Sequence, residues 1–168
     1  MAFHTRVQEV ERVVFATPLN ILVWGPGVGG RENSEKRIKV KAVLKSHFPG
    51  ADVAFSEDLS DVPSWGAELA QHERELWHLT LCDVCIVLDT SKGAGEEIAH
   101  FTATRLARKL FILTDEKYRG VSTFPAELRR HENQVFYTAS EFETCTLITR
   151  IVNRVKHVAL GKAINLLV

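Results

Sequence analysis

Two glycine-containing segments of this sequence have residue types and spacings that could bind a phosphate. The first, Gly25-Pro26-Gly27-Val28-Gly29-Gly30-Arg31-Glu32, follows the apolar run Ile21–Trp24 and contains the spacing G-x-G-x-x-G. Such a loop lets backbone N–H groups approach a phosphate at the start of a helix. The same composition also suits a plain connection between a strand and a helix, so this segment alone leaves both interpretations open.

The second segment, residues 89–97, adds carboxylates to the glycines. A hydroxyl and free N–H groups at the start of a helix suit a phosphate. Glu97 could attack, or stabilise, a sugar carbon that becomes cationic as its bond to a base breaks. The alternative is that Glu96 and Glu97 only complement the helix dipole. The candidate binding residues of this segment are Asp89, Ser91, Gly93 and Gly95.

The rest of the chain predicts the elements that position these segments, because short apolar runs alternate with helical patterns. The expected strands are Ile21–Trp24, Ala51–Phe55, Asp83–Leu88, Leu110–Leu113 and Gln134–Tyr137. This alternation predicts a single α/β domain of the flavodoxin-like or Rossmann-like kind, with three layers and a five-stranded parallel sheet. Ligands of such sheets bind beyond the carboxyl ends of the strands. We therefore expect both glycine segments to border one crevice, together with the acidic end of the second strand, Ser56-Glu57-Asp58.

Residues 1–20 are expected to form an N-terminal helical extension, with Val7, Val10 and Val14 on one helical face, and residues 21–168 the α/β domain. The helix after the first glycine segment is expected to be capped by Asn33 or Ser34.

Composition limits the class of protein. The chain has 168 residues, of which 45% are apolar, and its 21 basic residues balance 21 acidic ones. No overall field attracts a nucleic acid or an anionic membrane, and no window reaches the roughly 18 apolar residues that indicate a membrane span. We expect a cytoplasmic protein that binds a small molecule, without membrane or nucleic acid polymer.

Several reactive side chains are expected to be structural. Cys82 and Cys85 have redox or metal spacing, but they adjoin an apolar strand and suit burial as small hydrophobic residues. The histidines His72, His78 and His100 lack compact spacing and are expected at the surface or as helix caps. The charge run 105–109 is expected to be solvated. We expect neither a cofactor nor a metal ion.

The motifs GPGVGGRE, HERELWHLTLCDVCIVL and SKGAGEEIA together resemble the nucleoside 2-deoxyribosyltransferase-like superfamily, most closely its 2'-deoxynucleoside 5'-phosphate N-hydrolases. The resemblance covers residues 21–111. It implies a catalytic glutamate at Glu97, a phosphate-binding serine at Ser91, and a carboxylate at Glu75 that assists the reacting nucleoside. It also implies a homodimer with a shared site, to which Ser122 would contribute. Val28 stands where these hydrolases have an arginine.

The function expected is cleavage of the N-glycosidic bond of a (deoxy)nucleoside or nucleoside 5'-phosphate. Two alternatives stay open: an NAD-cleaving signalling module similar to Toll/interleukin-1 receptor-like domains, and a non-enzymatic nucleotide sensor. Glu57 and Asp58 lie too far beyond the first glycine segment for the ribose-binding acid of a dinucleotide fold. The predicted catalytic residues are Glu97 and Glu75, and the predicted substrate-binding residues are Gly25, Pro26, Gly27, Gly29, Gly30, Arg31, Asp58, Asp89, Ser91, Gly93, Gly95 and Ser122.

Overall fold

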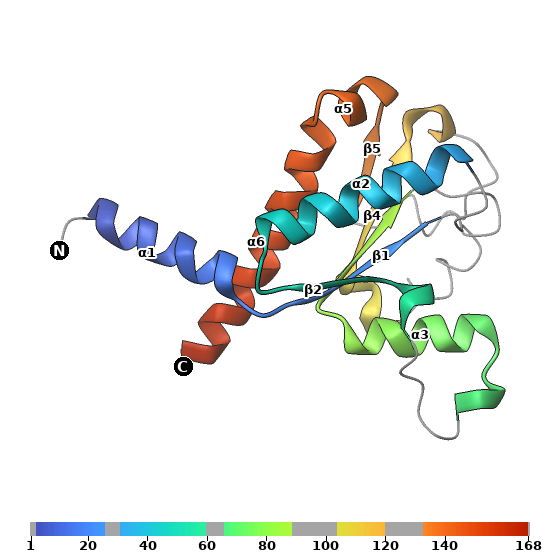
Figure 1. Ribbon diagram of the computed structural model, residues 1–168, viewed down its shortest axis with the longest axis horizontal. Helices are drawn as coiled ribbons and strands as arrows, with labels where there is room; N and C mark the ends of the chain where they lie inside the picture. Colours follow the sequence, from blue (N-terminus) through green and yellow to red (C-terminus); the bar gives the residue numbers. More distant parts are fainter. Residues whose placement is uncertain (1–2, 26–30, 60–65, 89–103, 120–132, 168) are drawn as a thin grey trace.

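The computed structural model describes residues 3–25, 31–59, 66–88, 104–119 and 133–167. Five parallel strands form one sheet in the order β2-β1-β3-β4-β5 (Figure 1). The strands are β1 (Asn20–Trp24), β2 (Asp52–Phe55), β3 (Val84–Leu88), β4 (Leu110–Asp115) and β5 (Gln134–Tyr137). This order is that of flavodoxin-like folds. It confirms the predicted fold class, and each strand ends within two residues of the predicted run.

The described helices are α1 (Phe3–Ala16), α2 (Arg31–His47), α3 (Gln71–Leu81), α5 (Ala139–Glu143) and α6 (Thr146–Leu167), with short 3-10 turns η1 (Ser56–Asp58), η2 (Gly66–Glu68), η3 (Arg105–Lys109) and η4 (Glu116–Tyr118). Helix α2 begins at Arg31, so Asn33 and Ser34 lie within the helix and the prediction that one of them caps its start is wrong. Arginine and glutamate are good helix formers, and the helix therefore includes Arg31 and Glu32. Within the described ranges, no helix combines the length and the apolar character needed to cross a bilayer.

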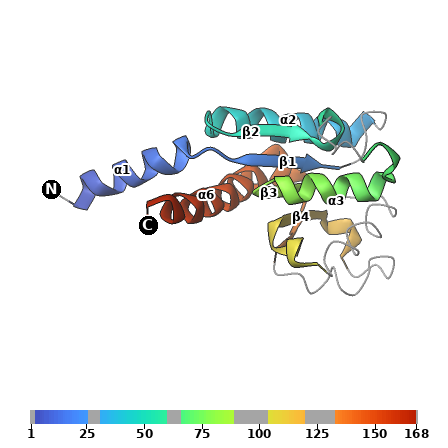
Figure 2. The ribbon, with the colours of Figure 1, turned by 90° about the horizontal axis from the view of Figure 1, so that it is seen from below.

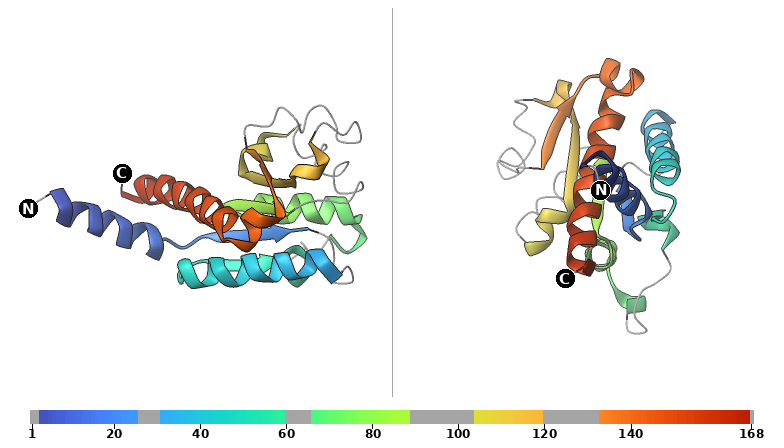
Figure 3. Two further views of the ribbon diagram at one scale, coloured as in Figure 1. Left: turned by 90° about the horizontal axis from the view of Figure 1, so that it is seen from above. Right: turned by 90° about the vertical axis from the view of Figure 1, so that its left-hand side faces the viewer.

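Alternate residues of β1 point to opposite faces of the sheet, and each face has its own apolar core. Ile21 and Val23 belong to the core that packs against α2 and α6. Leu22 and Trp24 belong to the core on the face of α3. Figures 2 and 3 show α2 and α3 on opposite sides of β1. The protein is thus a three-layer α/β domain, and because β3 is covered on both faces, all five of its residues are buried.

Helix α1 is only partly covered. It extends past the sheet beside the C-terminal half of α6 (Figure 1). Of the apolar face predicted for this helix, Val14 is buried, whereas Val7 and Val10 are 53% and 50% exposed. The expected helix is present, and most of its apolar face lies at the surface of the isolated chain.

The charge run 105–109 forms η3. The prediction that the whole run is solvated is wrong for Lys109, which is partly buried. Arg105 and Arg108 are exposed, but the Nζ of Lys109 donates hydrogen bonds to three backbone carbonyls at the end of α3. The acceptors are Leu79, Thr80 and Cys82, at 3.0, 2.8 and 2.7 Å. Carbonyls at the end of a helix lack partners within that helix, and Lys109 supplies them.

Candidate functional site

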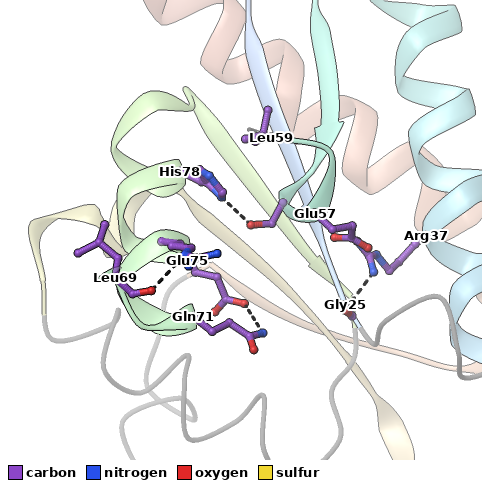
Figure 4. Close-up of a pocket in the computed structure, with 10 residues that line it drawn as sticks. Gly25, Arg37, Glu57, Leu59, Leu69, Gln71, Glu75 and His78 are labelled. Carbon is purple, nitrogen blue, oxygen red and sulfur yellow. Dashed lines mark hydrogen bonds and ion pairs between the residues drawn. The ribbon is translucent and has the colours of Figure 1, made fainter. Parts of the chain in front are cut away.

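A cavity of about 760 Å³ lies beside the carboxyl ends of β1 and β2, between η1 and α3 (Figure 4). Its volume is in the range of pockets that bind small ligands, and ligands of doubly wound sheets bind at this edge. The described residues that line it are Gly25, Arg37, Ser56, Glu57, Leu59, Leu69, Gln71, Arg74, Glu75 and His78. The candidate site is therefore where the fold predicts one.

Arg37 of α2 connects three parts of the cavity wall. Its side chain is 3% exposed, and its Nη2 atom forms an ion pair of 2.8 Å with Oε2 of Glu57. The guanidinium also donates to the backbone carbonyls of Val23 and Gly25, both at 3.3 Å, and lies 4.4 Å from the ring centre of Phe55. One side chain thereby fixes the end of β1, the end of β2 and η1 relative to one another.

Gly25 lies where this arrangement leaves no space for a side chain. A Cβ atom there would lie 2.9 Å from Cδ of Arg37 and 3.0 Å from the carbonyl oxygen of Leu88. Because Arg37 is buried and Leu88 ends β3, neither atom can move aside easily. The first glycine of the motif is thus required by the close approach of β1 to α2 and β3.

Glu57 and Asp58 are adjacent acids of η1 with different partners. Partial burial raises the pKa of Glu57, but hydrogen bonding to Arg37 and to its own backbone, with the attraction of Arg37, outweighs burial and holds this pKa below its usual value. Hydrogen bonding from Lys41 lowers the pKa of Asp58. Asp58 also accepts a hydrogen bond from the backbone of Phe55 at 3.2 Å. Asp58 is absent from the described lining of the cavity, and its binding role stays a prediction.

Helix α3 forms the opposite wall. Its start is capped by Glu73, which accepts a hydrogen bond of 2.8 Å from the backbone N–H of Ala70. Two residues later Glu75 is partly buried, and its Oε1 accepts a hydrogen bond of 3.2 Å from Nε2 of Gln71. Figure 4 shows Gln71 and Glu75 on this wall, facing Glu57 and Arg37 across the cavity. A carboxylate thus stands on each side.

The prediction that His78 lies at the surface or caps a helix is wrong, because its side chain is buried and contacts Ser56 of another segment. His78 is 4% exposed and lines the cavity three residues after Glu75. Its Nδ1 atom is hydrogen-bonded to Oγ of Ser56 at 2.8 Å, a contact that joins α3 to η1. His72, on the same helix, is exposed as predicted, and His100 lies outside the described residues.

The cysteines behave as predicted. Cys82 and Cys85 are both buried, and burial raises the pKa of Cys82 to about 12 and that of Cys85 well above its usual value. Neither thiol ionises near neutral pH, so neither is a reactive nucleophile there. In the part of the chain that is described, no three His, Cys, Asp or Glu side chains gather as metal ligands would.

Two predicted site residues, Gly25 and Glu75, lie together in the cavity, and Arg31 is the first residue of α2. Asp58 is described above, and apart from it the remaining site predictions fall on residues outside the described ranges and stay predictions. They concern Pro26, Gly27, Gly29, Gly30, Asp89, Ser91, Gly93, Gly95, Glu97 and Ser122.

Sequence reasoning missed Arg37 and His78 as cavity residues. It placed the acidic end of the second strand at the crevice, and Ser56 and Glu57 do line the cavity, although Glu57 was set aside as the ribose-binding acid of a dinucleotide fold. The sequence does contain a pattern that indicates the burial of Arg37. It precedes Val40 by three residues and Leu44 by seven, so it occupies the apolar stripe of α2. A charged residue in such a stripe requires a buried partner.

No protein-family model and no curated protein matches this sequence. The functional conclusion therefore depends on the cavity and on the motifs around it.

Proposed function

We propose that this protein cleaves the N-glycosidic bond of a nucleoside or nucleoside 5'-phosphate in the cavity beyond β1 and β2, with Glu97 as the catalytic carboxylate. The observation that supports this most strongly is the meeting of Gly25 and Glu75. They belong to separate motifs, far apart in the sequence, and both line the same cavity. The resemblance of those motifs to nucleoside deoxyribosyltransferase-like proteins suggests the chemistry.

The path of the chain is compatible with a catalytic role for Glu97. The carbonyl of Leu88 lies within 3.0 Å of the position that a Cβ of Gly25 would take. Leu88 is the last described residue before the second glycine segment, so Gly25, which begins the first segment, and Leu88 lie side by side at the carboxyl edge of the sheet.

In the proposed reaction, the bond between the anomeric carbon and the base nitrogen breaks, and its electron pair leaves with the base. A carboxylate stabilises the sugar cation or attacks it. Water or a second base then adds to the anomeric carbon, and the departing base gains a proton. Glu75, held by Gln71, is placed to assist the base or a sugar hydroxyl.

A homodimer in the cytoplasm is part of this proposal. The large apolar side chains exposed on α1 and α6 are Val7, Val10, Val13, Leu160 and Ile164. A second copy of the chain would cover them. Light scattering at tens of micromolar should give twice the mass of the chain, and a monomer at that concentration would contradict the dimer.

The activity is tested by incubating the protein with nucleosides, nucleoside 5'-phosphates and NAD, and by measuring free base with chromatography. Replacing Glu97 with Gln should lower the rate of base release about a thousandfold, because it removes the charge that stabilises the sugar cation. The matched variant Glu96→Gln should change the rate only a few-fold, since adjacent residues of the helix that the sequence predicts here would point in different directions.

Three outcomes would count against the proposal. Release of nicotinamide from NAD alone would favour the signalling alternative. Binding without release of base would favour the nucleotide sensor. Base release by Glu97→Gln at the wild-type rate would eliminate Glu97 as the catalytic group.

A further inference from the structure

The described walls of the cavity are rich in hydrogen-bond acceptors. Glu57 lines one wall and Glu75 the other (Figure 4). The two arginines already donate to protein atoms: Arg37 to Glu57 and backbone carbonyls, and Arg74 through Nε to the carbonyl of Leu69 at 3.0 Å. An anionic group between these walls would meet two carboxylates. A group that donates hydrogen bonds, such as a sugar hydroxyl, suits them better.

Glu57 is held firmly, yet it keeps capacity to accept more hydrogen bonds. Its Oε2 receives the guanidinium of Arg37 at 2.8 Å, and Arg37 is itself only 3% exposed. A carboxylate offers about four acceptor sites. The side chain of Glu57 is 44% exposed and borders the cavity, so a ligand can reach it. Preorganisation of this kind lowers the cost of binding, because the acceptor is already in place.

The position of Glu57 in the fold is suited to accepting a hydrogen bond from a ligand. It follows β2, which pairs with β1 next to the glycine segment. In doubly wound sheets that bind dinucleotides, an acid near this edge accepts hydrogen bonds from ribose hydroxyls. The long sequence separation argues against a dinucleotide fingerprint, but it does not keep Glu57 from the edge of the sheet where the glycine segment begins. In space, the carbonyl of Gly25 and the carboxylate of Glu57 share one arginine.

We propose that Glu57 accepts a hydrogen bond from a hydroxyl of the ligand's sugar, and that the cavity thereby selects a hydroxylated sugar at this wall. This inference rests on the proposed function, because it assumes a nucleoside or nucleotide ligand. Arg37 is the positioning residue that fixes the carboxylate.

The test compares ribonucleosides with 2',3'-dideoxynucleosides of the same base, each with and without a 5'-phosphate. Isothermal titration calorimetry measures binding, and chromatography measures base release from the same compounds. Wild-type protein should bind the hydroxylated sugar about tenfold to a hundredfold more tightly, the usual effect of a hydrogen bond to a charged group. Replacing Glu57 with Gln should reduce this preference to about threefold or less. The 2'-deoxy and 3'-deoxy compounds then identify the hydroxyl.

Asp52→Asn is the matched control, because Asp52 is an exposed acid at the opposite end of β2. It should keep the wild-type preference. If Glu57→Gln does not fold, Glu57→Asp keeps the charge, shortens the reach by one methylene, and should show the same loss of preference.

The inference is overturned if wild-type protein binds both sugars equally, or if the Glu57 variant keeps the full preference. In either case, base release by the wild-type protein leaves the proposed function intact. If no nucleoside or nucleotide binds or is cleaved, the proposed function fails, and the inference fails with it.

Discussion

The two ends of the sheet use charged residues in different ways. At the amino end, Asp83 accepts hydrogen bonds from Lys162 and from the backbone of Asn20, both at 2.8 Å. Lys109 caps the end of α3 at the same edge. At the carboxyl end, the pair of Arg37 and Glu57 also joins segments, but it borders a cavity.

We infer from this difference that the charged residues at the amino end stabilise the fold, whereas those at the carboxyl end also bind a ligand. Lys109 and Asp83 are engaged with the chain itself, so we expect their loss to cost stability alone. Glu57 and Glu75 have protein partners too, yet they line a space of ligand size. We expect substitutions there to change ligand binding and catalysis, with an additional loss of stability where a buried group loses its partner.

The largest effect on stability is expected for Arg37→Met, which would show that the cavity wall also supports the fold. The change removes donors from two backbone carbonyls and from Glu57. Urea unfolding should give a loss of about 2–4 kcal/mol, because buried acceptors remain without partners. Lys41→Met, which breaks the more exposed pair with Asp58, should cost less than about 1 kcal/mol. Equal losses in the two variants would contradict the structural role of Arg37.

Lys109→Met tests the other side of the comparison. It removes three hydrogen bonds to backbone carbonyls while keeping most of the side-chain volume. The free energy of unfolding should fall by about 1–2 kcal/mol, since Lys109 is only half-buried and water replaces part of the lost contact. Affinity for ligands should stay at the wild-type value. A large loss of affinity in the folded variant would show that the two ends are coupled.

The smallest expected effect is on the stability of the folded protein at acid pH. The pKa values of Glu57 and Asp58 in the folded protein lie below their ordinary values of 4.5 and 3.8. Their contribution to stability is therefore complete above those values, and it is lost as the pH falls through the lower, folded ones. Glu57→Gln should reduce the pH dependence of the unfolding free energy below pH 4.5, by less than about 1 kcal/mol because Glu57 is nearly half exposed. An unchanged dependence would show that the ion pair does not stabilise the fold.

The fold could be predicted from the sequence because apolar runs and helical periodicity depend only on residues that are close together in the chain. Apolar runs such as 84–88 require a strand covered on both faces, and their alternation with helical patterns implies parallel pairing. The same rule predicted that a cavity would form at the carboxyl ends, and Gly25 and Glu75 were found there. These inferences needed no knowledge of which side chains meet.

The residues that were missed depend on partners distant in the sequence. The burial of His78 follows from its contact with Ser56, which lies on another segment of the chain. Arg37 is acceptable in a core only because the ends of β1 and η1 supply acceptors for it. Periodicity places such residues on a helical face, but it does not reveal the tertiary partner whose hydrogen bonds offset the free-energy cost of burying them.

The most direct test of this account compares two acids at opposite ends of the sheet. The initial rate of base release is measured for wild-type protein, Glu75→Gln and Asp83→Asn, with the preferred substrate of the wild type. Glu75→Gln should lower the rate by about tenfold to a thousandfold, in the range of general acid–base and electrostatic effects, without loss of the fold. Asp83→Asn should release base at the wild-type rate while losing stability. If Glu75→Gln is as active as wild type and Asp83→Asn is not, the functional site does not lie at the carboxyl ends of the strands.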